Sequence, residues 1–146
     1  MLDNVRNFHH PLLMLTTASL TTRVIKDWQN RKPTYQETVE IGRWVAAVFV
    51  PGGVAVLALT LLHTSGLFAA LAVGLVLTLD PTLFFLSHYM KENSTLIFSL
   101  SLLFLTHTFF NRLPNLRNTA FLGAAMGLVG SSNYTGLISL AVVLLF

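Results

Sequence analysis

Residues 44–62 read WVAAVFVPGGVAVLALTLL, and this stretch without a single charged side chain decides the class of the fold. An α-helix rises about 1.5 Å per residue, so the stretch can cross most of a bilayer hydrocarbon core of about 30 Å. Pro51, Gly52 and Gly53 lie near its middle. A proline predicts a kink there, and the glycines predict the close approach of another helix.

The composition of the whole chain agrees with a membrane environment. Of 146 residues, 53% are hydrophobic and only 10% are charged, whereas soluble domains carry about 25% charged residues. The net charge is +3, but the bases lie between apolar segments, which is typical of membrane topology and not of a nucleic-acid surface. The chain has no cysteine, so disulfide and thiolate chemistry are excluded.

The pattern of apolar segments predicts an all-α integral membrane protein, a multi-spanning helical bundle. We expect about four to five spans plus one short broken or re-entrant helix, in a single transmembrane region over residues 1–146. The expected segments are 10–25, 44–63, a broken pair 66–79 and 81–90, 94–110, 119–135 and an incomplete 137–146. The chain starts in a polar segment and stops within an apolar run, so we expect a fragment of a longer protein.

Two basic loops, 26–43 and 111–118, are expected to be cytoplasmic because cytoplasmic loops carry an excess of Lys and Arg. Within the first loop, residues 34–41 are either a short interfacial helix or part of a solvated linker. Both lie on one side only if the pair 66–79 and 81–90 is re-entrant, with the helix broken at Asp80-Pro81. The scarce polar residues then gather at the outer face, where a cluster of costly ionisable groups suggests a site. These residues are Asp3, His9, His10, His63, His88, Lys91, Glu92, Asn133 and Tyr134.

Four segments, in this order and spacing, resemble a known family. They are FHHPL at 8–12, GRW at 42–44, SHYMKEN at 87–93 and GAAMGLVGSSNYTG at 123–136. Together they resemble the membrane core of the GT-C superfamily of polyprenyl-phosphate-sugar glycosyltransferases, in particular the protein O-mannosyltransferase-like enzymes.

The resemblance implies a GT-C-like core fragment that transfers a sugar from a polyprenyl-phosphate donor to a hydroxyl-bearing acceptor on the extracytoplasmic side. It implies no cofactor besides the lipid-linked sugar, which is the substrate. A positioned carboxylate acts as general base on the acceptor hydroxyl in such a reaction, and basic groups stabilise the departing phosphate. The family's catalytic acid precedes the His-Pro segment by more residues than this chain provides, so we expect the chain alone to be inactive.

By the same resemblance, Glu92 takes the second acidic position and is the candidate catalytic residue. The candidate substrate-binding residues are His10, Lys91, His88, Arg43, Asn133 and Tyr134. Asn133 replaces the family's usual lysine and cannot supply its charge.

Each of these residues also has a purely structural explanation. Glu92 can end a helix, Lys91 can extend to the headgroups, and His10 can precede a helix that starts at Pro11. For Arg43 a positive-inside anchor is the favoured explanation.

His88 and Glu92 are four residues apart and could share a helix face, but two ligands without a third do not predict a metal site. A rival function is a small multi-spanning transporter or membrane assembly subunit, because transporters also use broken helices. In either case the expected location is a cell membrane, bacterial or archaeal rather than the endoplasmic reticulum.

Overall fold

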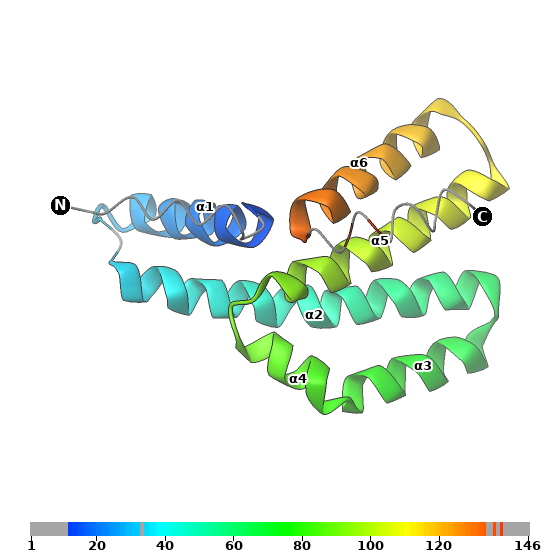
Figure 1. Ribbon diagram of the computed structural model, residues 1–146, viewed down its shortest axis with the longest axis horizontal. Helices are drawn as coiled ribbons and strands as arrows, with labels where there is room; N and C mark the ends of the chain where they lie inside the picture. The colour runs from blue at the N-terminus through cyan, green and yellow to red at the C-terminus, as the bar shows by residue number, and fades with distance from the viewer. Residues whose placement is uncertain (1–11, 33, 134–135, 137, 139–146) are drawn as a thin grey trace.

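A computed structural model describes residues 12–32, 34–133, 136 and 138 of the chain. These residues form six helices and no strand (Figure 1). The helices are α1 Leu12–Trp28, α2 Tyr35–Thr64, α3 Leu67–Leu79, α4 Pro81–His88, α5 Glu92–Arg112 and α6 Leu116–Ser132. The all-helical fold class is confirmed for the described residues.

Helix α2 is the long axis of the fold, and it begins before the apolar stretch that predicts it. Thr34 and Glu37 form a capping box, in which each side chain accepts a hydrogen bond from the other residue's backbone N–H. The helix then continues for 30 residues through Pro51. The interval 35–43, predicted as part of a loop, is therefore the first two turns of the span. Gly66, with φ +90°, allows the turn into α3.

The chain returns along α2 through two short helices, and the predicted break between them is present. Asp80 ends α3 and caps α4, because one of its carboxylate oxygens accepts hydrogen bonds from the backbone N–H of Thr82 at 2.6 Å and of Leu83 at 3.3 Å. Pro81 occupies the first position of α4, where its missing N–H costs nothing. The two helices are bent by 62°.

The predicted re-entrant path is wrong. Helix α3 packs back along the second half of α2, where Gly74 faces Ala58, and the chain after α4 reaches the early part of α2, where Met90 packs on Gly42. The two helices comprise 13 and 8 residues, or about 32 Å of helix at 1.5 Å per residue. Although α3 alone is too short to cross a bilayer, α3 and α4 together are long enough.

Helix α5 consequently runs parallel to α2, as Figure 1 shows. Gly53 of α2 packs on Phe98, and at the far end Arg112 donates a hydrogen bond to the carbonyl of His63. Loops 26–43 and 111–118, predicted to share the cytoplasmic side, therefore lie at opposite ends of the α2–α5 pair. His63 lies at the end opposite to His88, which corrects its expected place at a common rim.

Two described helices, α2 and α5, are long and apolar enough to cross a membrane, or three segments if α3 and α4 count as one bent span. A membrane location is thus supported, but a bundle of four to five spans is not confirmed. Helices α1 and α6 are shorter, at 17 residues each, and the predicted segment 137–146 falls almost wholly outside the described residues.

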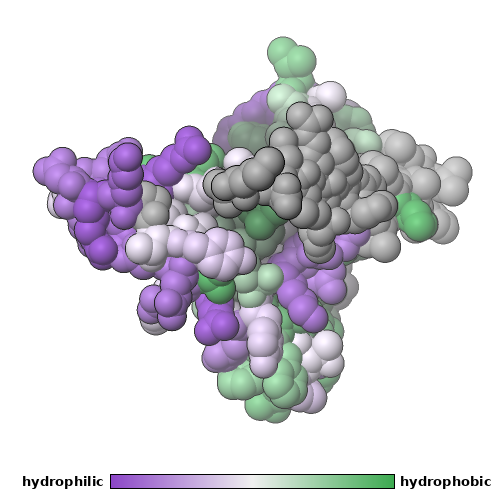
Figure 2. Space-filling view, turned by 60° about the vertical axis from the view of Figure 1, so that its left-hand side comes forward, coloured by the Kyte–Doolittle hydropathy of each residue, from purple (hydrophilic) through white to green (hydrophobic). Residues whose placement is uncertain are grey.

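An ion pair fixes α1 to the start of α2. Lys26 is only 5% exposed, and its Nζ lies 2.8 Å from Glu37 Oε1. Arg31 contacts the same carboxylate oxygen at 2.6 Å. Burying a lysine is costly unless it is paired, so this contact holds the two helices in register. Figure 2 shows hydrophilic side chains gathered at this end of the molecule.

Small and polar side chains fill the contact between α5 and its neighbours. Buried Ser99 Oγ lies 2.9 Å from Ser132 Oγ of α6, next to a small apolar cluster of Leu103, Ala125 and Val129. Large apolar side chains such as Phe68, 90% exposed, face outward. Small and polar side chains inside and large apolar side chains outside are expected where lipid surrounds the helices. Close packing and interhelical hydrogen bonds then drive helix association.

The Gly53 contact predicts the effect of adding one methyl group. A β-carbon at Gly53 would lie 2.9 Å from Ile97 Cγ2 and 3.1 Å from the backbone of Phe98. We expect Gly53→Ala to destabilise the protein by about 1–3 kcal/mol through overpacking, measured by thermal unfolding in detergent. Gly123→Ala is the control, because nothing lies within 4 Å of its β-carbon position. Equal unfolding temperatures for the two variants would contradict the close contact.

The parallel course of α2 and α5 predicts which loops share a side of the membrane. Single cysteines at Tyr35, Lys91 and Leu113 can be probed with an impermeant thiol reagent, since the native chain has no cysteine. All three residues are exposed. We expect positions 35 and 91 to react from one side and position 113 only from the other. Labelling of 91 and 113 from the same side would restore the re-entrant path.

Candidate functional site

The candidate site is a groove between α2 and α4, of roughly 610 Å³. Its mouth carries Glu40 and Arg43 from α2, and His88 and Tyr89 from the end of α4. The rest of its lining is apolar except for Ser87, and comprises Trp44, Ala47, Phe84, Phe85 and Ser87. The groove therefore joins a charged rim to a mainly apolar interior.

Regular helix geometry places the α2 side of the groove. Glu40, Arg43, Trp44 and Ala47 follow one another at intervals of three, one and three residues, which brings them to one face of a helix. The capping box that starts α2 nine residues before the apolar stretch is what puts Glu40 and Arg43 on this helix.

His88 is oriented by its own helix. Its Nδ1 lies 2.8 Å from the carbonyl oxygen of Phe84 and 3.0 Å from Ser87 Oγ, and its ring packs on the Phe84 ring at 4.3 Å between centroids. A carbonyl can only accept, so Nδ1 carries the proton in this contact. In the neutral ring Nε2 is then a hydrogen-bond acceptor.

A second cavity of roughly 460 Å³ lies next to the groove along α2, with α3 and α4 on its other side. The two share Ala47, Phe84, Ser87 and His88. The second cavity extends to Ala58 and Gly74, and most of its lining is apolar. From Glu40 to Ala58 the helix rises about 27 Å, so the charged mouth and the mainly apolar lining of the two neighbouring cavities together extend nearly as far as a bilayer core is thick.

The structure brings part of the predicted site together. Arg43 and His88 line the same groove. Lys91 and Glu92 follow directly and form the start of α5, with Lys91 exposed and Glu92 half-buried. Asn133 reaches the same end, because its Nδ2 donates to Asn93 Oδ1 at 3.3 Å. None of these three residues lines the groove. Lys91 and Glu92 follow its last lining residue, Tyr89, closely in the sequence, and Asn133 reaches the same end through Asn93.

Two predicted residues, His10 and Tyr134, lie outside the described residues, as do Asp3 and His9. Sequence reasoning missed Glu40 and Tyr89, which line the groove. The spacing of three residues between Glu40 and Arg43 could have indicated that both lie on one face of a helix. This signal was lost because residues 34–41 were separated from the span that starts at Trp44.

The structure also corrects the argument about a metal. His88 ends α4 and Glu92 begins α5, so the two residues are not on one helix and their spacing of four places them on no common face. Among the described residues no group of three or more His, Asp or Glu side chains is arranged to hold a metal ion.

Comparisons with protein families, with curated proteins and with solved structures found no match for this chain. The chemistry of the site therefore has to be argued from its own residues.

Proposed function

We propose that this chain belongs to the membrane core of a glycosyltransferase and binds a polyprenyl-phosphate sugar in the groove between α2 and α4. The observation that carries the proposal is the groove with its charged mouth, next to a mainly apolar cavity along the same helix. A lipid-linked sugar has the same division, with a polar phosphate sugar at one end and a hydrocarbon chain at the other.

Arg43 is the phosphate contact in this proposal. A guanidinium binds phosphate through two parallel N–H donors and stays charged at all relevant pH values. His88 Nε2 and the Tyr89 hydroxyl offer further hydrogen-bonding groups at the mouth. The prenyl chain then extends from Ala47 towards Ala58, where it is removed from water.

The transfer step needs a carboxylate near the mouth. The acceptor hydroxyl oxygen attacks the anomeric carbon, the bond from that carbon to the phosphate oxygen breaks, and polyprenyl phosphate leaves with the electron pair. The hydroxyl proton passes to a carboxylate acting as general base. Glu92 is the residue that the family resemblance assigns, and Glu40 is the carboxylate that lines the groove.

The proposal places the mouth on the extracytoplasmic side, so loop 111–118 is cytoplasmic and loop 26–43 is not. The positive-inside rule favours the opposite orientation, because it places the side richer in Lys and Arg in the cytoplasm. The described bases at the mouth end outnumber those at the other end, which are Arg112 and Arg117. The thiol labelling described above tests this point: reaction of positions 35 and 91 from outside supports the proposed transfer side, and reaction of position 113 from outside overturns it.

The broken helix at Asp80-Pro81 is the observation that favours a transporter instead, because half-helix ends often form transporter sites. Here one Asp80 oxygen already caps two backbone N–H groups of α4. The break therefore has a structural explanation, and the glycosyltransferase proposal is preferred.

Donor binding can be measured without turnover. Purified protein in nanodiscs is titrated with undecaprenyl phosphate, the shared part of such donors. We expect Arg43→Gln to weaken binding about tenfold or more, because hydrogen bonds to charged groups contribute about 1.5–3 kcal/mol. We expect Ala47→Phe to obstruct both cavities and weaken binding as well.

Arg117→Gln is the matched control, an exposed base at the other end of the bundle that stacks on Phe121, and it should bind like the native chain. Circular dichroism confirms that each variant is folded. Native affinity in folded Arg43→Gln, or equal binding of undecaprenol without phosphate, would refute the proposed phosphate contact.

A further inference from the structure

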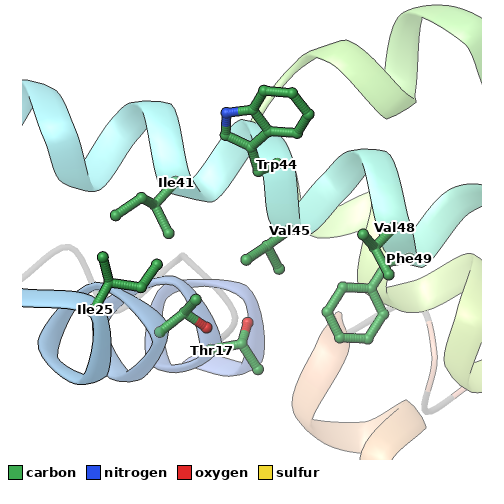
Figure 3. Close-up of a pocket in the computed structure, with 8 residues that line it drawn as sticks. Thr17, Ile25, Ile41, Trp44, Val45, Val48 and Phe49 are labelled. Carbon is green, nitrogen blue, oxygen red and sulfur yellow. The ribbon is translucent and has the colours of Figure 1, made fainter. Parts of the chain in front are cut away.

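A second groove lies on another face of α2, between α2 and α1, with a volume of roughly 400 Å³. Figure 3 shows side chains from the two helices facing each other across it, with Ile25 of α1 opposite Ile41 and Val45 of α2. Its full lining is Thr17, Thr21, Ile25, Ile41, Trp44, Val45, Val48 and Phe49. No part of the proposed donor site uses this groove except Trp44, which lines both.

The chemistry of the lining is that of hydrocarbon. Six of the eight side chains are apolar or aromatic, and the Thr17 hydroxyl donates to the carbonyls of Leu13 and Met14 in its own helix. Thr17 therefore has its hydroxyl satisfied without any ligand. A groove with so few free polar groups does not hold ordered water well.

The groove has a basic cluster at one end. Beyond Ile25 and Ile41 lie the buried Lys26 and its partner Glu37, to which Arg31 is also bound. Within residues 23–37 the bases are Arg23, Lys26, Arg31 and Lys32, and the acids are Asp27 and Glu37, so this end keeps a net positive charge. Such clusters at a membrane surface attract anionic lipid headgroups.

The length of the groove fits one leaflet. From Thr17 to Ile25 the α1 helix rises about 12 Å, close to the depth of one leaflet in a hydrocarbon core of about 30 Å. On α2 the groove starts at Ile41 and runs along the beginning of the uncharged stretch. An acyl chain can therefore enter it from the bilayer while its headgroup stays at the basic cluster.

We propose that the groove between α1 and α2 is a second lipid site, which holds an acyl chain of an anionic phospholipid with its headgroup at the Arg23–Lys32 cluster. The site is distinct from the donor groove, and Trp44 is the one residue that lines both. A phospholipid bound there contributes to holding α1 against α2, in addition to the Lys26–Glu37 ion pair.

The chain offers a direct probe, since it has two tryptophans, Trp28 and Trp44. Trp28 is 88% exposed and lines neither groove, so Trp28→Phe leaves Trp44 as the only reporter. This variant is reconstituted in phosphatidylcholine vesicles with a minor fraction of phosphatidylglycerol, and either lipid is supplied with brominated acyl chains. Bromine quenches tryptophan fluorescence on contact, and we expect stronger quenching by brominated phosphatidylglycerol than by an equal fraction of brominated phosphatidylcholine.

Substitutions locate the bound chain. Thr21→Phe fills the α1–α2 groove and should remove the excess quenching, whereas Leu20→Phe, at the neighbouring exposed position outside the lining, should keep it. Arg31→Gln should reduce the excess. Ala47→Phe fills the donor groove only and should leave the excess unchanged.

Equal quenching by the two brominated lipids would overturn the proposal, because Trp44 would then report only the surrounding bilayer. Loss of the excess in Ala47→Phe but not in Thr21→Phe would also overturn it, because the lipid would occupy the donor groove. Neither result depends on Arg43, so failure here is distinguishable from failure of undecaprenyl phosphate binding.

Discussion

The close parallel contact of α2 and α5 is the constraint on which the arrangement depends. At Gly53 the backbone of Phe98 lies where a β-carbon would almost touch it, and such close approach gives helices in lipid their packing energy. Two consecutive spans joined by a short turn are antiparallel. A parallel pair therefore needs a return segment of full length, which α3 and α4 supply. Because of this return, the residues that follow α4 lie beside the early part of α2, and Arg43 and His88 line the same groove.

The continuity of α2 determines what the site can bind. One uninterrupted helix carries Glu40 and Arg43 near its start and a mainly small or apolar face from Ala47 to Ala58 further along. A ligand lying along this face meets charge first and hydrocarbon afterwards. If the helix began at Trp44, Arg43 would belong to a loop, and the guanidinium would have no fixed position relative to this face. The capping box of Thr34 and Glu37 is thus a determinant of the site although it touches no ligand.

Much of the fold could be predicted from the sequence because its signals are local. Asp80-Pro81 predicts a break through the capping geometry of one aspartate and the missing N–H of one proline, and the structure has both. A helix start at Thr34 could be predicted, but its continuity with the span could not, because hydropathy changes sharply at Trp44 and separates residues 34–41 from the apolar stretch. The path of α3 and α4 was misplaced because the re-entrant path was inferred from the charge rule, which required loops 26–43 and 111–118 to share one side. Whether Arg43 and His88 line one groove depends on this path, so the site could not be fixed before the fold, and Glu40 was missed with it.

The bases near the mouth show why charge counting did not settle the topology. The positive-inside rule treats each Lys or Arg as a signal of orientation, yet several of these bases have specific partners. Lys26 is buried against Glu37, Arg31 shares that carboxylate, and Arg43 lines a groove suited to a phosphate. Arg112 and Arg117 flank a short turn between helices and have no carboxylate partner within the described part of the chain, but Arg112 donates to the His63 carbonyl and Arg117 stacks on Phe121. A base that is retained to bind a partner or a ligand is required on whichever side that function lies. The number of bases at each end therefore does not by itself fix the orientation of this chain, because Lys26 and Arg31 at the mouth end are held by Glu37.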